Sequence, residues 1–273
     1  MHFSVTILGV GSASPKLGRH PTAQLVNYDT NHYLVDCGEG TQYQLLKYKC
    51  RPNKLKHIFI SHLHGDHYFG LVGLLSSLNL SGRSEPMWVI GPRGLAEVIT
   101  LAFKYAESPP QFAIHFTEVD STRSYQVFEN EHLSVHSIPL QHRIPCAGYL
   151  FREKQNPQRS YAFCSDTRYD AAVVAHVRGV SLLYHEATFC DDLAHQSGSR
   201  YHATARQAAQ VASEAEVGGL LIGHFSSRYK TLEDFETQAQ EVFPATQLAE
   251  EGVTFLVAPR PPLAAKNNPP RSE

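Results

Sequence analysis

The sequence has few cysteines, and they form no pattern. Five occur among 273 residues, and no two of them make a C-x-x-C pair. An odd, scattered set argues against a disulfide framework, so the sequence predicts a protein of a reducing compartment, the cytoplasm. The cysteines are Cys37, Cys50, Cys146, Cys164 and Cys190.

Long apolar runs and a strong net charge are missing too. No segment approaches the roughly 20 apolar residues of a membrane span, and the N-terminus shows no secretion signal, so no membrane contact is predicted. The net charge of −2 gives no overall attraction to nucleic acid, so any such binding needs a local basic patch. Residues 47–56 are one candidate for such a patch. The stretch either contacts an RNA backbone or, in the simpler interpretation, only forms a solvated face. The basic residues of this stretch are Lys47, Lys49, Arg51, Lys54 and Lys56.

Short apolar runs alternate with helical patterns, which is typical of a layered α/β fold. No internal linker is visible, so we predict one domain over residues 1–257 and a disordered tail over 258–273. Helices are expected from Pro92 to Phe103, from a capping box at Thr204 to Gly218, and from Thr231 onward. Strands are expected at 5–8, 33–36, 58–61, 88–90, 133–138, 161–164, 182–184, 220–222 and 253–257.

Histidine is the compositional outlier, with 16 residues, and four potential metal ligands stand together in an H-x-H-x-D-H cluster. The cluster follows the strand-like run 58–61 and contains His62, His64, Asp66 and His67. Imidazole and carboxylate groups suit zinc or a similar first-row metal. One ion cannot easily take all four ligands from so short a segment, so the spacing indicates two metals. Paired metals commonly hydrolyse phosphate esters or acyl bonds.

Three further polar residues stand just beyond apolar runs elsewhere in the chain. They are His142, Asp166 and His224. Active-site loops commonly lie at strand ends on a rigid scaffold. Any one of the three taken alone is equally well a surface residue at the start of a loop. Together with the histidine cluster, they are candidates to complete a two-metal site.

With these motifs the chain resembles the metallo-β-lactamase superfamily and, within it, the ribonuclease Z family of tRNA 3′-processing endonucleases. The histidine cluster marks only the superfamily. The His185–Phe189 and Gly223–Tyr229 segments indicate the ribonuclease Z family in particular. The resemblance also rests on residues 7–9, 12–13, 36–42, 61–67 and 165–167.

The resemblance implies a four-layer αβ/βα sandwich with two zinc ions, or Mn²⁺ in their place, and precursor tRNA as substrate. It also implies a homodimer. One ion would be held by His62, His64 and His142, and the other by Asp66, His67 and His224, with Asp166 bridging the two.

The resemblance further implies catalytic roles for Asp66, which would orient or deprotonate the attacking water, and for Glu186 with His202, which would protonate the leaving oxygen. Ala203 replaces the serine usual beside this histidine. The simpler interpretation of Glu186 is that it caps a loop. Asp36 either supports a ligand histidine or only braces the turn at 37–40. Ser226, Ser227 and Arg228 are candidate phosphate contacts, although Arg228 also fits an ordinary surface charge.

Many ribonucleases Z carry a long arm that grips tRNA between the segments matching His142 and Asp166. Here only residues 143–165, 23 in all, separate them, and 149–159 is predicted to be a tight hairpin. Two alternatives therefore stay open beside tRNA processing. One is a general phosphodiesterase acting on small or single-stranded substrates, and the other is a non-catalytic, metal-stabilised RNA-binding module.

Overall fold

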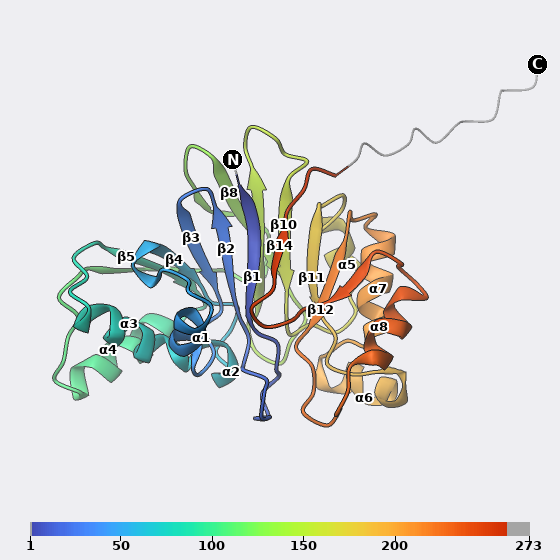
Figure 1. Ribbon diagram of the computed structural model, residues 1–273, viewed down its shortest axis with the longest axis horizontal. Coiled ribbons are helices and arrows are strands. Elements are labelled where there is room, and N and C mark those ends of the chain that lie inside the picture. The colour runs from blue at the N-terminus through green and yellow to red at the C-terminus, as the bar shows by residue number, and fades with distance from the viewer. Residues whose placement is uncertain (1, 261–273) are drawn as a thin grey trace, which may run out of the picture.

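Two mixed β-sheets pack face to face in the computed structural model of the chain, which describes residues 2–260 (Figure 1). The first sheet has seven strands in the order β14 (Thr254–Leu256), β1 (Phe3–Gly9), β2 (Ala23–Tyr28), β3 (Asn31–Val35), β4 (Leu55–Phe59), β5 (Met87–Gly91) and β6 (Ile114–Glu118). The second has seven in the order β13 (Thr246–Leu248), β12 (Leu220–Gly223), β11 (Leu182–Glu186), β10 (Ser160–Cys164), β9 (Ala147–Glu153), β8 (Leu133–Pro139) and β7 (Gln126–Glu129).

Helices cover the outer face of each sheet, which gives the predicted four-layer αβ/βα sandwich. The first sheet carries α1 (Thr41–Lys47), α3 (Gly70–Leu80) and α4 (Leu95–Tyr105). The second carries α5 (Ala171–His176), α7 (Ala205–Glu214) and α8 (Glu233–Gln240). Two short helices, α2 (Gly65–Tyr68) and α6 (Ala194–Ser197), lie at the lower edge of the sandwich in Figure 1.

Alternation along the strands divides the core into two parts. In β1, Phe3, Val5 and Ile7 enter the cluster between the sheets, while Leu8 packs with the helices outside. Successive side chains of a strand point to opposite faces, and here both faces are covered. This double burial explains why the strands read as nearly continuous apolar runs in the sequence.

Parallel pairing brings the loops that matter for function to one edge. Strands β3, β4 and β5 are parallel to one another, and so are β10, β11 and β12. The carboxyl ends of these strands therefore meet along the same edge of the sandwich, where ligands commonly bind in α/β proteins.

The nine predicted strands are all present, and the predicted hairpin is formed by β9 and β10, which pair antiparallel with Arg152 opposite Ser160. The connection from His142 to Asp166 therefore contains no long arm. Strands β2, β6, β7 and β13 were not predicted.

The helix boundaries needed correction. The capping box at Thr204 is confirmed, but α7 ends at Glu214, four residues before Gly218. Helix α4 begins at Leu95, after Pro92, and α8 begins at Glu233, with Leu232 in place of Thr231 at its cap. The predicted disordered tail lies outside the described residues except for 258–260. No helix within residues 2–260 has the length and hydropathy needed to cross a bilayer.

Candidate metal centre

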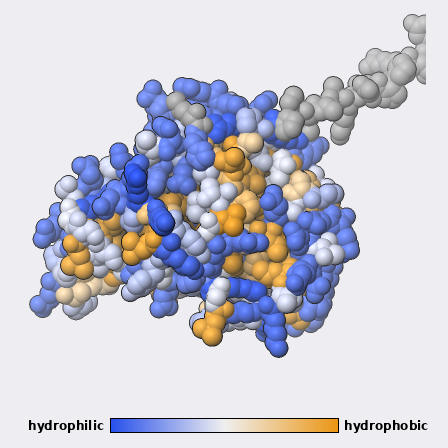
Figure 2. Space-filling model, viewed as in Figure 1, coloured by the Kyte–Doolittle hydropathy of each residue, from blue (hydrophilic) through white to orange (hydrophobic). Residues whose placement is uncertain are grey.

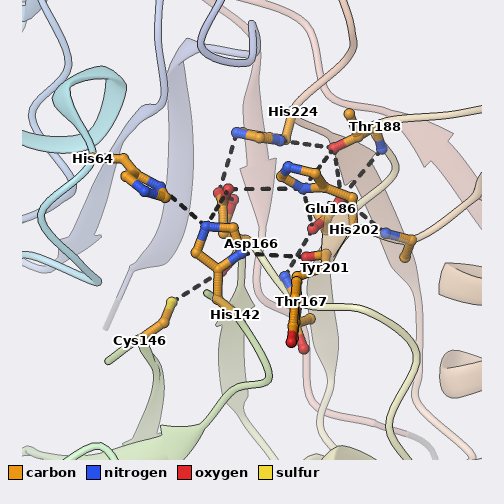
Figure 3. Close-up of polar contacts among 12 residues, drawn as sticks. His64, His142, Cys146, Asp166, Thr167, Glu186, Thr188, Tyr201, His202 and His224 are labelled. Atoms are coloured by element: carbon orange, nitrogen blue, oxygen red, sulfur yellow. Dashed lines mark hydrogen bonds and ion pairs between the residues drawn. The ribbon is translucent and has the colours of Figure 1, made fainter. Parts of the chain in front are cut away.

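All seven predicted metal ligands meet at the loop edge of the sandwich. The histidine cluster follows β4, His142 follows β8, Asp166 follows β10 and His224 follows β12. Five of them line an open cavity of about 410 Å³: His64, Asp66, His142, Asp166 and His224. Figure 3 shows the side chains of His142, Asp166, His202 and His224 pointing toward one another from separate loops.

One set of nitrogens gathers around the first carboxylate oxygen of Asp166. Nδ1 of His64 lies 3.0 Å from Nε2 of His62 and 3.0 Å from Nε2 of His142. Oδ1 of Asp166 lies 3.9 Å from Nε2 of His62 and 3.6 Å from Nε2 of His142. These four atoms form the first potential metal site.

The second oxygen of Asp166 faces the other set. Its Oδ2 lies 2.9 Å from Nε2 of His67 and 3.1 Å from Nε2 of His224. Oδ2 of Asp66 lies 3.3 Å from the same nitrogen of His67 and 3.4 Å from that of His224. Asp166 therefore presents one oxygen to each ligand set, as a bridging carboxylate does.

These separations fit a shared cation better than direct hydrogen bonds. Nε2 of His67 is buried, and it has no hydrogen-bond partner although two carboxylate oxygens lie close to it. Lone pairs aimed at a common point produce this geometry. Zinc–nitrogen bonds near 2.0 Å in a tetrahedral site place neighbouring ligand atoms about 3.3 Å apart. The donor set therefore fits metal binding.

The nitrogen that each of four ligand histidines turns away from the centre has a polar partner, as is usual in metal sites. These contacts fix which nitrogen faces the centre. The pairs are Nδ1 of His62 with Oγ of Ser61 at 3.0 Å, His67 with Oδ2 of Asp36 at 2.7 Å, His142 with the carbonyl of Tyr201 at 3.3 Å, and His224 with Oγ1 of Thr188 at 2.9 Å.

Two roles were predicted for Asp36, and its contact with His67 agrees with the first, the support of a ligand histidine. Its Oδ1 accepts from the backbone N–H of Ser61 at 2.7 Å, and its Oδ2 accepts from Oγ of Ser61 at 2.9 Å as well as from His67. It is fully buried and has a positive φ of 56°. Asp166 and His224 also lie in this left-handed region, with φ of 59° and 61°. Non-glycine residues are uncommon there, and functional sites concentrate such strain.

The buried charges favour a cation in the centre. Burial lowers the pKa of His62 well below its ordinary value and also lowers the pKa of His142, so both rings stay neutral and able to ligate. Burial opposes charge on His67 as well, but the carboxylates of Asp166, Asp66 and Asp36 outweigh it and raise the pKa of His67. A cation at this point, whether a proton or a metal, balances those carboxylates.

Glu186 and His202 form a pair beside the centre. Nδ1 of His202 lies 2.9 Å from Oε1 of Glu186, and its ring stacks against His224 with centroids 5.5 Å apart. Glu186 also accepts from Oγ1 of Thr188 at 2.6 Å, from the N–H of Thr167 at 2.8 Å and from the N–H of Ala203 at 3.2 Å. The carboxylate thus braces three loops and orients the imidazole, so capping is only part of its structural role. Because residue 203 contributes its backbone N–H, alanine is accommodated there.

The predicted phosphate contacts border the same cavity. Ser226, Ser227 and Arg228 line it, together with Arg143 and Arg200, which the sequence did not suggest. The side chains of the three arginines are exposed at the cavity rim. Exposed guanidinium groups beside a candidate metal centre suit a phosphate backbone.

Comparison with known proteins agrees with this site. A family profile described as a beta-lactamase superfamily domain matches residues 31–225. A ribonuclease Z of Cytophaga hutchinsonii is 42% identical over 95% of this chain and 98% of its own length. That of Parabacteroides distasonis is 38% identical over 93% of this chain and 99% of its own. The alignment with the first runs over 306 positions, more than the 273 residues of this chain, so that relative contains segments absent here.

Solved structures give the same result. Human tRNase Z, short form, superposes with a TM-score of 0.81 at 30% identity, covering 93% of this chain and 99% of that one. The metallo-beta-lactamase fold protein YhfI of Bacillus subtilis shares the fold, with a TM-score of 0.79 over 94% of this chain and 100% of that one, at 19% identity. The chain therefore belongs to the ribonuclease Z family of the metallo-β-lactamase superfamily.

Proposed function

We propose that this protein is a metal-dependent endoribonuclease that removes the 3′ trailer from precursor tRNA. One observation carries the proposal: the two oxygens of Asp166 face two separate ligand sets inside a cavity that His202 also lines. A two-metal centre beside a general acid is suited to phosphodiester hydrolysis. Relatives named ribonuclease Z and tRNase Z support RNA as the substrate.

Two zinc ions fit the donor set, and Mn²⁺ is an alternative. His62, His64 and His142 would hold one ion, Asp66, His67 and His224 the other, and Asp166 would bridge them. Zinc, when bound, lowers the pKa of water toward about 7 and withdraws charge from phosphoryl oxygens.

Asp66 is better suited to hold and orient a water than to deprotonate it. Burial alone would raise the pKa of its carboxyl, but the charge of His67 and a hydrogen bond from His224 hold that pKa below its usual range. A carboxylate with a depressed pKa accepts a hydrogen bond but is a weak base. The geometry therefore favours the orienting role.

His202 is the proton donor in this proposal. Burial opposes its charged form, but Glu186 more than compensates and raises the pKa of His202 to about 9. The imidazole is therefore protonated at neutral pH. Because Glu186 holds Nδ1, Nε2 is the nitrogen left to protonate the leaving 3′ oxygen. Arg143, Arg200 and Arg228 would hold the flanking phosphates.

Purified protein loaded with zinc or manganese and given a 3′-extended precursor tRNA tests the proposal. We expect release of the trailer and a 3′-hydroxyl on the tRNA product. Metal analysis on the same preparation should give two ions per chain. An intact precursor in the presence of both metals would contradict the proposed function.

The short β9–β10 hairpin favours a second candidate, a general phosphodiesterase for small or single-stranded substrates. The catalytic residues would be the same, and only the grip on folded tRNA would be missing. Efficient turnover of a chromogenic phosphodiester by protein that leaves structured precursor tRNA intact would establish this alternative.

We also propose that the protein acts as a homodimer in the cytoplasm. Tyr43 and Leu46 on α1 are 69% and 66% exposed, and they border a cavity lined by Leu74 and Leu78 of α3. An exposed apolar surface of this kind suits a second copy of the chain. Light scattering of the wild type and Leu46→Glu should give a dimer and a monomer, respectively. The five free thiols suit a reducing compartment.

A further inference from the structure

Four rings form a ladder across the inner face of the first sheet. The strand register places Tyr33 opposite His57, His57 opposite Trp88 and Trp88 opposite His115, one residue from each of β3, β4, β5 and β6. Successive ring centroids are 5.7, 5.3 and 5.4 Å apart. Such a row requires the four strands to be in this register.

The ladder emerges from the core toward solvent. Tyr33 is buried at 1% exposure, His57 is partly buried, Trp88 is 36% exposed, and His115 on the last strand of the sheet is exposed. In Figure 1 the labelled strands β4 and β5 lie toward the left, away from β11 and β12 of the second sheet. The exposed fractions show that the second sheet leaves the outer rings, those of Trp88 and His115, at least partly uncovered.

A cavity of about 460 Å³ opens beside these rings. Tyr33, His57 and Trp88 line it on one side, and Phe128 of β7 lies on the other, with its ring 4.2 Å from that of His57. Pockets for small organic groups commonly have volumes of about 300 Å³ or more. The cavity therefore has room for a flat aromatic group, with Asn31 and Thr117 supplying polar atoms at its wall.

A cation, Lys56, lies at the wall of this cavity. It belongs to the stretch from residue 47 to 56, which the metal centre does not use and which holds five basic residues and no acidic one. On the other side, Lys154 neutralises Glu129 of β7 at 2.9 Å. Flat rings beside a lysine match the two parts of a nucleotide, since a base stacks and a phosphate pairs with lysine.

We propose that the ring ladder and Lys56 bind unpaired nucleotides of an RNA, as a second RNA site separate from the metal centre. His57 lies in β4 and the ligand His62 follows that strand five positions later, so the two sites lie on the order of 15 Å apart at most. The inference rests on the proposed RNA substrate, and it supplies a grip that the short β9–β10 hairpin cannot give.

The chain carries its own reporter for this site, because Trp88 is its single tryptophan. Short single-stranded RNA added to the full-length protein should quench tryptophan fluorescence, and salt should weaken the binding. Variants are compared by the anisotropy of a labelled RNA. Trp88→Ala should weaken binding about tenfold or more, while Trp88→Phe should keep most of it. Lys56→Gln should reduce the salt dependence by about one phosphate contact.

Matched controls come from α4, on the outer face of the same sheet. Tyr105→Ala removes an exposed aromatic ring and Lys104→Gln an exposed cation, and neither should change binding. All variants should hydrolyse a chromogenic phosphodiester at the wild-type rate, which separates this site from the metal centre. Thermal melting of each variant checks that it is folded.

Three results would overturn the inference. In the first, the protein cleaves the precursor but RNA does not quench its tryptophan fluorescence. This result would leave the proposed function intact. In the second, folded Trp88→Ala binds RNA with unchanged affinity. In the third, tryptophan emission changes with protein concentration in the absence of RNA, and Trp88→Ala alters the oligomeric state. The face would then be an interface between copies of the chain. RNA binding at Trp88 without precursor cleavage would instead contradict the proposed function.

Discussion

The Nδ1 atom of His202 lies 2.9 Å from Oε1 of Glu186. That carboxylate also accepts a hydrogen bond from the hydroxyl of Thr188, which contacts the ligand His224. One buried acid therefore links the proposed proton donor to the metal centre. Its own pKa is lowered, chiefly by the charge of His202 working against burial, so it stays ionised.

Glu186→Gln should lower kcat about a hundredfold and shift its pH dependence. The active form of His202 is protonated, and its pKa is raised to about 9, so activity should be present below that pH and be lost as the pH rises through it. Removing the carboxylate charge lowers this pKa, so the basic limb of the kcat profile should move to lower pH. The exposed Glu214→Gln is the matched control. If the basic limb of the kcat profile does not move, Glu186 does not set the pKa of the proton donor.

Asp66→Ala should abolish turnover while leaving the fold largely intact. The side chain contributes one oxygen to the second ligand set and orients the attacking water in the proposed mechanism. We expect a loss of about a thousandfold, equivalent to about 4 kcal/mol. Circular dichroism and metal content should be measured beside activity, with exposed Asp234→Ala for comparison. Surviving activity would show that the mechanism is wrong.

Asp36→Asn should weaken metal binding about tenfold to a hundredfold, because it removes the charge that orients His67. Asparagine tolerates the left-handed backbone at this position, so the change isolates the charge. Asp29→Asn is a close control, since Asp29 also has a positive φ, 53°, but is exposed on the β2–β3 turn. Competition with a chelator measures both variants. Equal affinities would exclude the supporting role of Asp36.

One thiol of the native protein should react readily with a disulfide reagent. Cys50 is partly exposed, while Cys37, Cys146, Cys164 and Cys190 are buried. Burial raises the pKa of Cys37 and of Cys190 to about 12, which further suppresses their thiolates. A single fast equivalent should disappear in Cys50→Ser, and all five should react after denaturation. If several thiols of the native protein react rapidly, the four buried cysteines are not packed as described.

The ligands were predictable because their signal is local. Each follows a buried strand, and an imidazole or carboxylate at a strand end stands out against the apolar run before it. Supporting residues such as Thr188 and Ser61 were missed, because a hydroxyl reveals its partner only when distant loops meet. Arg143 and Arg200 were missed for the same reason, since an exposed arginine has no periodicity.

The same difference separates the strands that were predicted from those that were not. Central strands such as β11 are buried on both faces and read as apolar runs. The edge strand β6 is largely exposed and reads as a loop. The ring ladder depends on the register of four strands, and only the three-dimensional structure reveals that. The hydrophilic face in Figure 2, with a hydrophobic stripe near its middle over β1 and β14, likewise depends on a pairing of distant segments.

That pairing joins a strand near the start of the described residues to one near their end. Ser4 of β1 lies opposite Leu256 of β14, with the whole second sheet between them in sequence. During synthesis the first sheet cannot be completed until almost the last described residues have emerged. Until then one long edge of β1 offers its backbone to any passing strand, which is a route to aggregation. By pairing with β1, strand β14 therefore also limits aggregation, and a chain truncated just before β14 would leave that edge of β1 unpaired.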